Sequence, residues 1–217
     1  MRLLLAHGWA LDRALWDAVL AALGDDAAGA VALDAGYYGR PAGPPSAGGP
    51  FLGVGQSLGA LELLAAPPAP LAGLVVLDGF ARFGSAEDFA QGQPARVLDR
   101  MARRLDSDAA GGVDEFLGRA FPMSARPPGL LDAPRLAEGL KRLQTLDGRP
   151  AVRRLPLWRL HAEADPIAPG ALADASFAEA GDVRQDLRRR GSDHLSPLSA
   201  PAACADLIRQ ALRELGS

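Results

Sequence analysis

Short apolar runs alternate along this sequence with segments whose apolar residues recur at helical spacing, and this alternation limits the possible folds more than any other feature. Short apolar runs that end at turn residues are typical of buried strands. In the first part of the chain these runs are residues 3–6, 30–33, 51–55 and 71–77, and the helical segments are 12–24 and 57–67. Strands that alternate with helices pair in parallel through right-handed crossovers. We therefore predict a mostly parallel sheet with helices on both faces.

The alternation is interrupted between residues 80 and 149. Helical periodicity is found at 94–105, 112–120 and 134–146, with no strand between these segments. Afterwards the alternation returns, with strands at 155–161 and 183–188 and helices at 170–180 and 201–215. This pattern predicts a helical cap inserted after the strand that ends near Leu77. We expect residues 1–80 and 150–217 to form the core and residues 81–149 to form the cap.

Composition excludes several classes of protein. Of 217 residues, 48% are hydrophobic and 23% are charged, as in ordinary globular domains. Cys204 is the only cysteine, so neither a disulfide framework nor a cysteine-based metal site is expected. The net charge of −3 gives no reason to expect nucleic-acid binding. No apolar run approaches the roughly 18–20 residues of a membrane span. We predict a cytoplasmic monomer without metal or cofactor.

The run Gly55-Gln-Ser57-Leu-Gly59 lies between a predicted strand and a predicted helix. A G-x-S-x-G sequence in this context places a serine on a tight turn at the end of a sheet, where its hydroxyl is exposed for nucleophilic attack. The N-terminus of the following helix favours negative charge at that point. A dinucleotide-binding turn is the competing interpretation, but the acidic residue that would contact a ribose is missing.

Two further residues complete a catalytic triad in the sequence. Asp165 follows the strand 155–161, and His194 follows the last predicted strand. The chain order Ser57, Asp165, His194 is the nucleophile–acid–base order of the α/β-hydrolases. In that scheme His194 accepts the serine proton, and Asp165 orients the imidazole. Asp78, which ends the strand 71–77, is a second candidate for the acid, and we favour Asp165 because of its loop position.

An oxyanion hole requires two main-chain N–H groups beside the nucleophile. The residue after the serine, Leu58, supplies one, and the loop after the first strand supplies the other. In that loop Gly8 allows the main chain to turn inward, and Trp9 is the predicted donor. The remaining histidines, His7 and His161, are predicted to be structural residues of the core.

The segments Leu5-Ala-His7-Gly-Trp9-Ala-Leu-Asp12, Gly55-Gln-Ser57-Leu-Gly59 and Gln93-Pro-Ala-Arg96-Val-Leu, together with Asp165 and Gly191-Ser-Asp-His194, resemble the pimeloyl-[acyl-carrier protein] methyl ester esterases of biotin synthesis. The resemblance covers nearly the whole chain. It implies an α/β-hydrolase fold and hydrolysis of a methyl ester on a carrier-bound acyl chain through an acyl-serine. It also implies that Trp9 and Leu58 flank the oxyanion, with Trp9 and Phe116 contacting the substrate.

The sequence departs from this family in two places. It begins at the strand before His7, so we expect a reduced N-terminus without leading antiparallel strands. The glycine- and proline-rich segment 36–50 stands where a helix normally precedes the nucleophile strand, and its prolines exclude a continuous helix. Neither departure removes a candidate catalytic residue.

One predicted face of the cap suits an acidic partner. Arg96, Arg100, Arg103 and Arg104 lie at spacings of four, seven and eight residues and so share one side of a helix. An acyl carrier protein offers an acidic helix and a phosphate group to such a face. A solvated helix face, neutralised in part by Asp99 and Asp106, is the alternative interpretation.

Two other functions remain open at this stage. The first is another α/β-hydrolase that acts on small esters or thioesters. The second is a non-catalytic binding module with a hydrolase-like fold, although such a module has no need of the triad.

Overall fold

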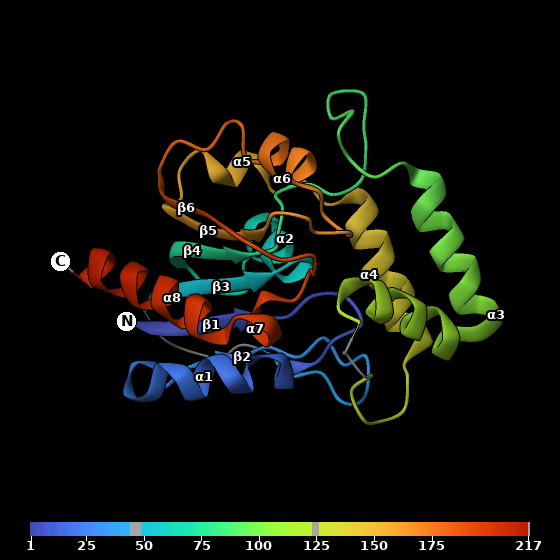
Figure 1. Cartoon of the computed structure of the whole chain (residues 1–217), viewed down its shortest axis with the longest axis horizontal. Coiled ribbons are helices and arrows are strands. Elements are labelled where there is room, and N and C mark those ends of the chain that lie inside the picture. Colours follow the sequence, from blue (N-terminus) through green and yellow to red (C-terminus); the bar gives the residue numbers. More distant parts are fainter. Residues whose placement is uncertain (44–48, 123–125, 217) are drawn as a thin grey trace.

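Six strands form one sheet, all paired in parallel, in the computed structural model, which describes residues 1–43, 49–122 and 126–216 (Figure 1). The sheet order is β2-β1-β3-β4-β5-β6. The strands are β1 (Arg2–Ala6), β2 (Val31–Ala32), β3 (Phe51–Gln56), β4 (Leu71–Leu77), β5 (Leu157–Ala162) and β6 (Val183–Arg189). The predicted parallel sheet is confirmed. The predicted strand 30–33 is shorter, because only two of its residues pair with β1.

Helices cover both faces of the sheet, as predicted. Successive strand side chains point to opposite faces, so Leu3 and Leu5 pack with one layer and Leu4 with the other. The first layer holds α1 (Asp17–Leu23) and α8 (Pro201–Gly216). The 3-10 turns η1 (Arg13–Trp16) and η2 (Gly24–Ala27) lie directly before and after α1, and α7 (Ser196–Ser199) precedes α8. The second layer holds α2 (Leu58–Ala65), α5 (Arg149–Val152) and α6 (Gly170–Ser176).

Two long helices are inserted between β4 and β5. They are α3 (Ala95–Ala120) and α4 (Ala133–Thr145), and they lie beyond the carboxyl ends of the strands, at the opposite end of the molecule from both termini (Figure 1). The division into a core of 1–80 and 150–217 and a cap of 81–149 stays a prediction. We use the word cap below for the segment that holds α3 and α4.

The two helices predicted at 94–105 and 112–120 meet directly within α3, so the expected gap between them was wrong. The helical path breaks at one residue, Asp108, whose φ is −161° and ψ is 83°. The Asp108 side chain accepts a hydrogen bond from the N–H of Gly111 at 2.9 Å. Asp108 therefore caps the second half of α3 where the first half ends.

Two other expectations differ from the structure in detail. The helix predicted at 170–180 ends at Ser176, whose hydroxyl donates to the carbonyl of Ala173. In the segment 36–50, residues 44–48 lie outside the described residues, and the rest of the segment forms no helix. One bridge, Asp34 to Ala42, closes its first part.

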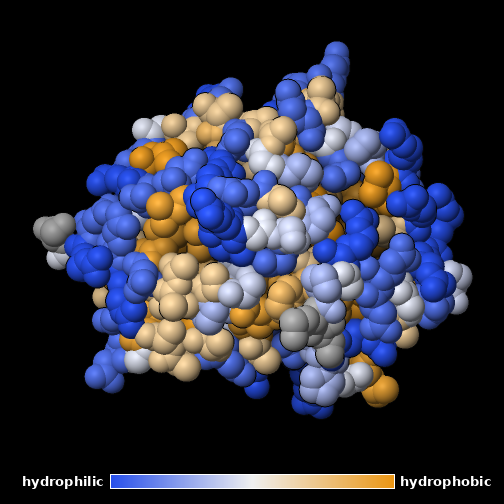
Figure 2. All heavy atoms as spheres, viewed as in Figure 1, coloured by the Kyte–Doolittle hydropathy of each residue, from blue (hydrophilic) through white to orange (hydrophobic). Residues whose placement is uncertain are grey.

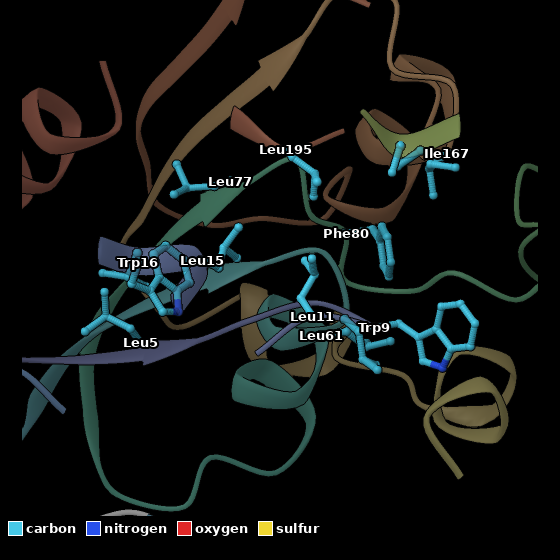
Figure 3. Packing of buried hydrophobic residues seen from close by; sticks show 14 of the residues in the cluster. Leu5, Trp9, Leu11, Leu15, Trp16, Leu61, Leu77, Phe80, Ile167 and Leu195 are labelled. Carbon is cyan, nitrogen blue, oxygen red and sulfur yellow. The ribbon is translucent and has the colours of Figure 1, made fainter. Parts of the chain in front are cut away.

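Several hydrogen bonds join the cap to the core. The Trp9 indole Nε1 donates to the carbonyl of Leu136 in α4 at 2.8 Å, and the N–H of His194 donates to the carbonyl of Ala120 in α3 at 2.7 Å. In Figure 3, Trp9 lies at the cap end of the buried cluster, and Leu5 and Trp16 lie at the other end. Within the described ranges, no helix combines the length and apolar character needed to cross a membrane.

Candidate active site

Ser57 occupies a strained turn between β3 and α2. Its φ of +52° and ψ of −122° lie in a region that side chains rarely adopt. Close packing on both sides explains the flanking glycines. A Cβ at Gly59 would lie 2.1 Å from the carbonyl oxygen of Ala6, and a Cβ at Gly55 would lie 2.4 Å from the Cα of Ala60. Only glycine at these two positions lets α2 start directly against the sheet.

The three predicted triad residues lie in hydrogen-bond contact. His194 Nε2 is 2.8 Å from Ser57 Oγ, and His194 Nδ1 is 2.6 Å from Asp165 Oδ2. All three residues are buried, with 1–5% of their surface exposed. The second carboxylate oxygen, Asp165 Oδ1, accepts the main-chain N–H groups of Ile167 and Ala168 at 2.8 and 2.9 Å. These two bonds hold the carboxylate in place and leave its other oxygen for the imidazole.

The surroundings of His194 raise the pKa of its imidazole above the ordinary value of 6.5. Burial alone lowers that pKa, but the charge and the hydrogen bond of Asp165 outweigh burial, with smaller contributions from Asp78 and Asp193. A base in this setting holds a proton readily once it has accepted one. This is the property that general-base catalysis requires.

Asp78, the alternative candidate for the acid, binds main-chain N–H groups and not the His194 imidazole. Its Oδ1 accepts the N–H of Ala162 at 3.1 Å, and its Oδ2 accepts the N–H of Ser196 at 2.7 Å. The side chain is fully buried, and burial raises the pKa of its carboxyl, partly offset by His194. Both oxygens are thus used by main-chain groups, and the geometry favours Asp165 as the partner of His194.

The predicted oxyanion residues flank Ser57. Leu58 is the first residue of α2, and the loop that carries Trp9 packs tightly on the serine turn. A Cβ at Gly8 would lie 2.3 Å from Gln56 Oε1 and 3.0 Å from Ser57 Cβ. The main chain at Gly8 therefore passes close to the nucleophile. The roles of Trp9 and Leu58 in binding an oxyanion stay predictions.

The other two histidines are buried, as predicted. His7 Nδ1 donates to the carbonyl of Gly8 at 2.8 Å, and its Nε2 accepts the N–H of Ala35 at 3.1 Å. His7 thereby joins the first loop to the loop after β2. His161, at the end of β5, has no hydrogen-bond partner for either ring nitrogen among the described residues.

A small apolar cavity of about 50 Å³ adjoins Ser57. We call this the inner cavity. A second, outer cavity of about 160 Å³ is lined by α3 and by Trp9, and it shares part of its lining with the first. The shared residues are Val97, Met101, Phe116 and Arg119. Phe116 also packs edge-on against Trp9, with 4.9 Å between ring centroids. The shared lining places the outer cavity next to the inner one, which reaches Ser57.

The structure adds cavity residues that the sequence analysis did not single out. Phe80, Phe83, Leu143 and Ile167 line the inner cavity, and Arg119 lines both cavities. The position of Phe80, three residues beyond the end of β4, was the one available signal, because side chains that follow parallel strands gather at the carboxyl edge of the sheet.

The predicted arginine face divides into two pairs. Arg100 and Arg104 line the outer cavity, whereas Arg96 and Arg103 are exposed and line neither cavity. Arg104 pairs with Asp108 at 2.9 Å. In the part of the chain that the structure describes, no ion pair is formed by Arg96, Arg100 or Arg103, nor by Asp99 or Asp106. Figure 2 shows hydrophilic side chains over most of the side of the molecule where α3 lies.

The parallel sheet, the serine turn and the inserted cap define the α/β-hydrolase fold, and solved structures share it. An esterase from Thermogutta terrifontis is similar over 100% of this chain and 91% of its own, with a TM-score of 0.74 and 21% identity. An esterase from Exiguobacterium antarcticum is similar over 100% of this chain and 92% of its own, with a TM-score of 0.75 and 15% identity. An enol-lactonase from Burkholderia xenovorans is similar over 97% of this chain and 90% of its own, with a TM-score of 0.73 and 16% identity.

No family model matches the chain, and no curated protein matches it. At identities of this size, structural similarity establishes the fold and leaves the chemistry to be argued from the site itself.

Proposed function

We propose that this protein is a serine carboxylesterase that hydrolyses the methyl ester of a pimeloyl chain carried by acyl carrier protein. One observation supports the esterase activity above all others: the continuous contact from Ser57 Oγ through the His194 imidazole to Asp165. This arrangement makes a serine nucleophilic at neutral pH.

The geometry supports an acyl-enzyme mechanism. Ser57 Oγ attacks the ester carbonyl while its proton passes to His194 Nε2, and the Asp165 carboxylate stabilises the imidazolium. The N–H groups of Trp9 and Leu58 stabilise the oxyanion. His194 then protonates the leaving methoxide, and methanol departs. Water, activated by the same imidazole, hydrolyses the acyl-serine and regenerates the Ser57 hydroxyl.

The two cavities suit an acyl chain with an anionic group at its far end. The inner cavity is lined mainly by apolar side chains, which accommodate methylene groups. The outer cavity has three guanidinium groups, from Arg100, Arg104 and Arg119, against one carboxylate, from Glu115. A phosphate on the prosthetic arm of a carrier protein is a good partner for such a group of arginines. Arg96 and Arg103 extend the positive face toward an acidic helix of the carrier.

Methanol release from methyl-pimeloyl carrier protein, measured by mass spectrometry, tests the activity directly. We expect turnover by the wild-type protein and no turnover by the Ser57→Ala and His194→Ala variants. Labelling by a fluorophosphonate probe should be lost in the same variants. Absence of labelling in the wild-type protein would instead indicate a binding module.

A small-ester hydrolase is the second candidate, and the small volume of the cavity beside Ser57 favours it. The double variant Arg96→Glu/Arg103→Glu separates the two candidates, since neither residue lines a cavity. For the carrier esterase, turnover of the carrier substrate should fall roughly tenfold, because two favourable charge contacts become repulsive. Hydrolysis of a p-nitrophenyl ester should not change.

The matched control for this double variant is Arg213→Glu, an exposed residue on α8 at the opposite end of the molecule. It should leave both activities intact. If the wild-type protein hydrolyses the p-nitrophenyl ester and releases no methanol from the carrier substrate, the small-ester hydrolase replaces the carrier esterase. Full turnover of the carrier substrate by Arg96→Glu/Arg103→Glu would remove these two arginines from the carrier contact.

A further inference from the structure

The residue before the nucleophile has a long-range contact with the catalytic base. Gln56 is fully buried at the end of β3, and its Nε2 donates to the main-chain carbonyl of His194 at 2.8 Å. The two residues are 138 positions apart in the sequence. The last residue of β3 therefore contacts the base directly, and the nucleophile is the next residue along the chain.

The main chain of His194 is held from two elements. Its N–H donates to the carbonyl of Ala120, the last residue of α3, at 2.7 Å. Its carbonyl accepts the Gln56 amide. The N–H and the carbonyl of His194 thus both form hydrogen bonds with residues outside the loop that carries it. Of the two contacts, only the Gln56 amide comes from a side chain, so only this one can be removed by a substitution.

The oxygen of the Gln56 side chain helps to explain why an amide stands at this position. Gln56 Oε1 is buried and has no hydrogen-bond partner among the described residues. A buried polar atom without a partner is costly, and a methionine of similar length would avoid that cost. The donor half of the amide accounts for its presence, because the His194 carbonyl can only accept.

We propose that Gln56 is a positioning residue for His194. Its amide fixes the position of the His194 main chain, and hence the distance from the imidazole to the Ser57 hydroxyl. This role rests on the proposed serine-esterase function. Gln56 forms no hydrogen bond with the Ser57 hydroxyl or with Asp165. It acts only through its contact with His194.

The test compares Gln56→Met, which keeps the length and loses the donor, with the wild-type protein on a p-nitrophenyl ester. A shift of the base by a fraction of an ångström to 1 Å costs up to about 10²-fold in rate. We expect kcat to fall roughly 10–100-fold with KM nearly unchanged, because the cavities are not altered.

Val54→Ala is the matched control. Val54 is buried on the same strand, and shortening it should lower thermal stability without affecting the base. We expect Val54→Ala to retain the wild-type kcat. A Gln56→Met variant that loses thermal stability yet keeps the wild-type kcat would overturn the proposal, because that result describes a packing residue.

A second measurement separates this proposal from the proposed function. The Nδ1 proton of His194, shared with Asp165, should give a low-field proton resonance in the wild-type protein. We expect that resonance to shift or broaden in Gln56→Met and to persist in Val54→Ala. If the wild-type protein hydrolyses no ester, the resonance still reports on positioning. An unchanged resonance in Gln56→Met would reject the positioning role.

Discussion

Two buried carboxylates lie close to the base, and their hydrogen bonds give them different tasks. Asp165 contacts the imidazole, whereas Asp78 joins the end of β5 to the start of α7 through the N–H groups of Ala162 and Ser196. Ala162 lies three residues before Asp165, and Ser196 lies two residues after His194. Asp78 thus ties together the two chain segments that carry the acid and the base.

Asparagine substitutions should separate these two tasks. In Asp165→Asn the amide no longer stabilises the imidazolium or the correct tautomer, and we expect kcat to fall by about 10⁴-fold while the fold persists. In Asp78→Asn one main-chain N–H loses its acceptor, and we expect a loss of stability of about 1–3 kcal/mol. Ester kinetics and thermal unfolding of both variants check this. If kcat falls more in Asp78→Asn than in Asp165→Asn, and the stability of Asp78→Asn is unchanged, then Asp78 is the acid and Asp165 the structural carboxylate.

At the scale of elements, the start of α2 depends on how closely its first turn approaches β1. Gly59→Ala would bring a methyl group to 2.1 Å from the carbonyl oxygen of Ala6, so the helix must move away from the sheet. We expect a destabilisation of about 1–3 kcal/mol, with each kcal/mol lowering Tm by roughly 2–4 °C. Labelling of Ser57 should slow as well, because the same turn sets the position of the serine.

Gly118→Ala is the control for this substitution, because the chemical change is the same and the surroundings differ. Gly118 lies in α3, and apart from its chain neighbours and the backbone of its own helix no atom lies within 4 Å of the position where its Cβ would stand. Alanine favours a helix over glycine, so stability should rise by about 0.4–1 kcal/mol. Equal Tm shifts in the two variants would mean that close packing at Gly59 is not what selects glycine.

The sequence predicts some of these elements well, for physical reasons. The strand 71–77 agrees with the structure at both ends, because a continuous apolar run between proline and a polar turn leaves little choice. Ser57, Asp165 and His194 were found because each follows a strand, and strand ends of a parallel sheet meet at one edge. The contact from Gln56 to His194 and the two partners of Asp78 were not predictable, since no local pattern marks a pairing across more than 80 residues.

The break within α3 shows a different limit. The spacing of apolar residues gave two separate helices, and the structure joins them at Asp108. Periodicity finds helical faces but not the geometry by which two helices meet, because that geometry depends on one capping side chain. Here the cap is the Asp108 carboxylate on the N–H of Gly111.

At the scale of the whole molecule, His161 connects pH to stability. Burial, together with the charges of Arg159 and Arg188, lowers its pKa well below the ordinary 6.5. Above pH 6.5 the imidazole is neutral in both states. Below that pH the unfolded chain binds a proton that the folded protein excludes, so folding stability decreases as pH falls. His194 acts in the opposite direction: its raised pKa contributes stability below pH 6.5, and this contribution is lost as pH rises through the folded-state pKa.

His161→Phe should therefore reduce the acid sensitivity of the fold. The substitution keeps a ring in the same buried place, and neither ring nitrogen has a partner to lose within the described chain. Each pH unit below 6.5 costs the wild-type protein up to about 1.4 kcal/mol through this residue. Between pH 7.5 and 5.5, thermal unfolding of His161→Phe should show a smaller fall in Tm than the wild-type protein, by a few degrees.

Val76→Ala provides the comparison, because it removes buried volume from β4 and adds no change in titration. Its Tm should lie below that of the wild-type protein at every pH, with the same slope. If His161→Phe also runs parallel to the wild-type curve, the proton excluded on folding is not that of His161.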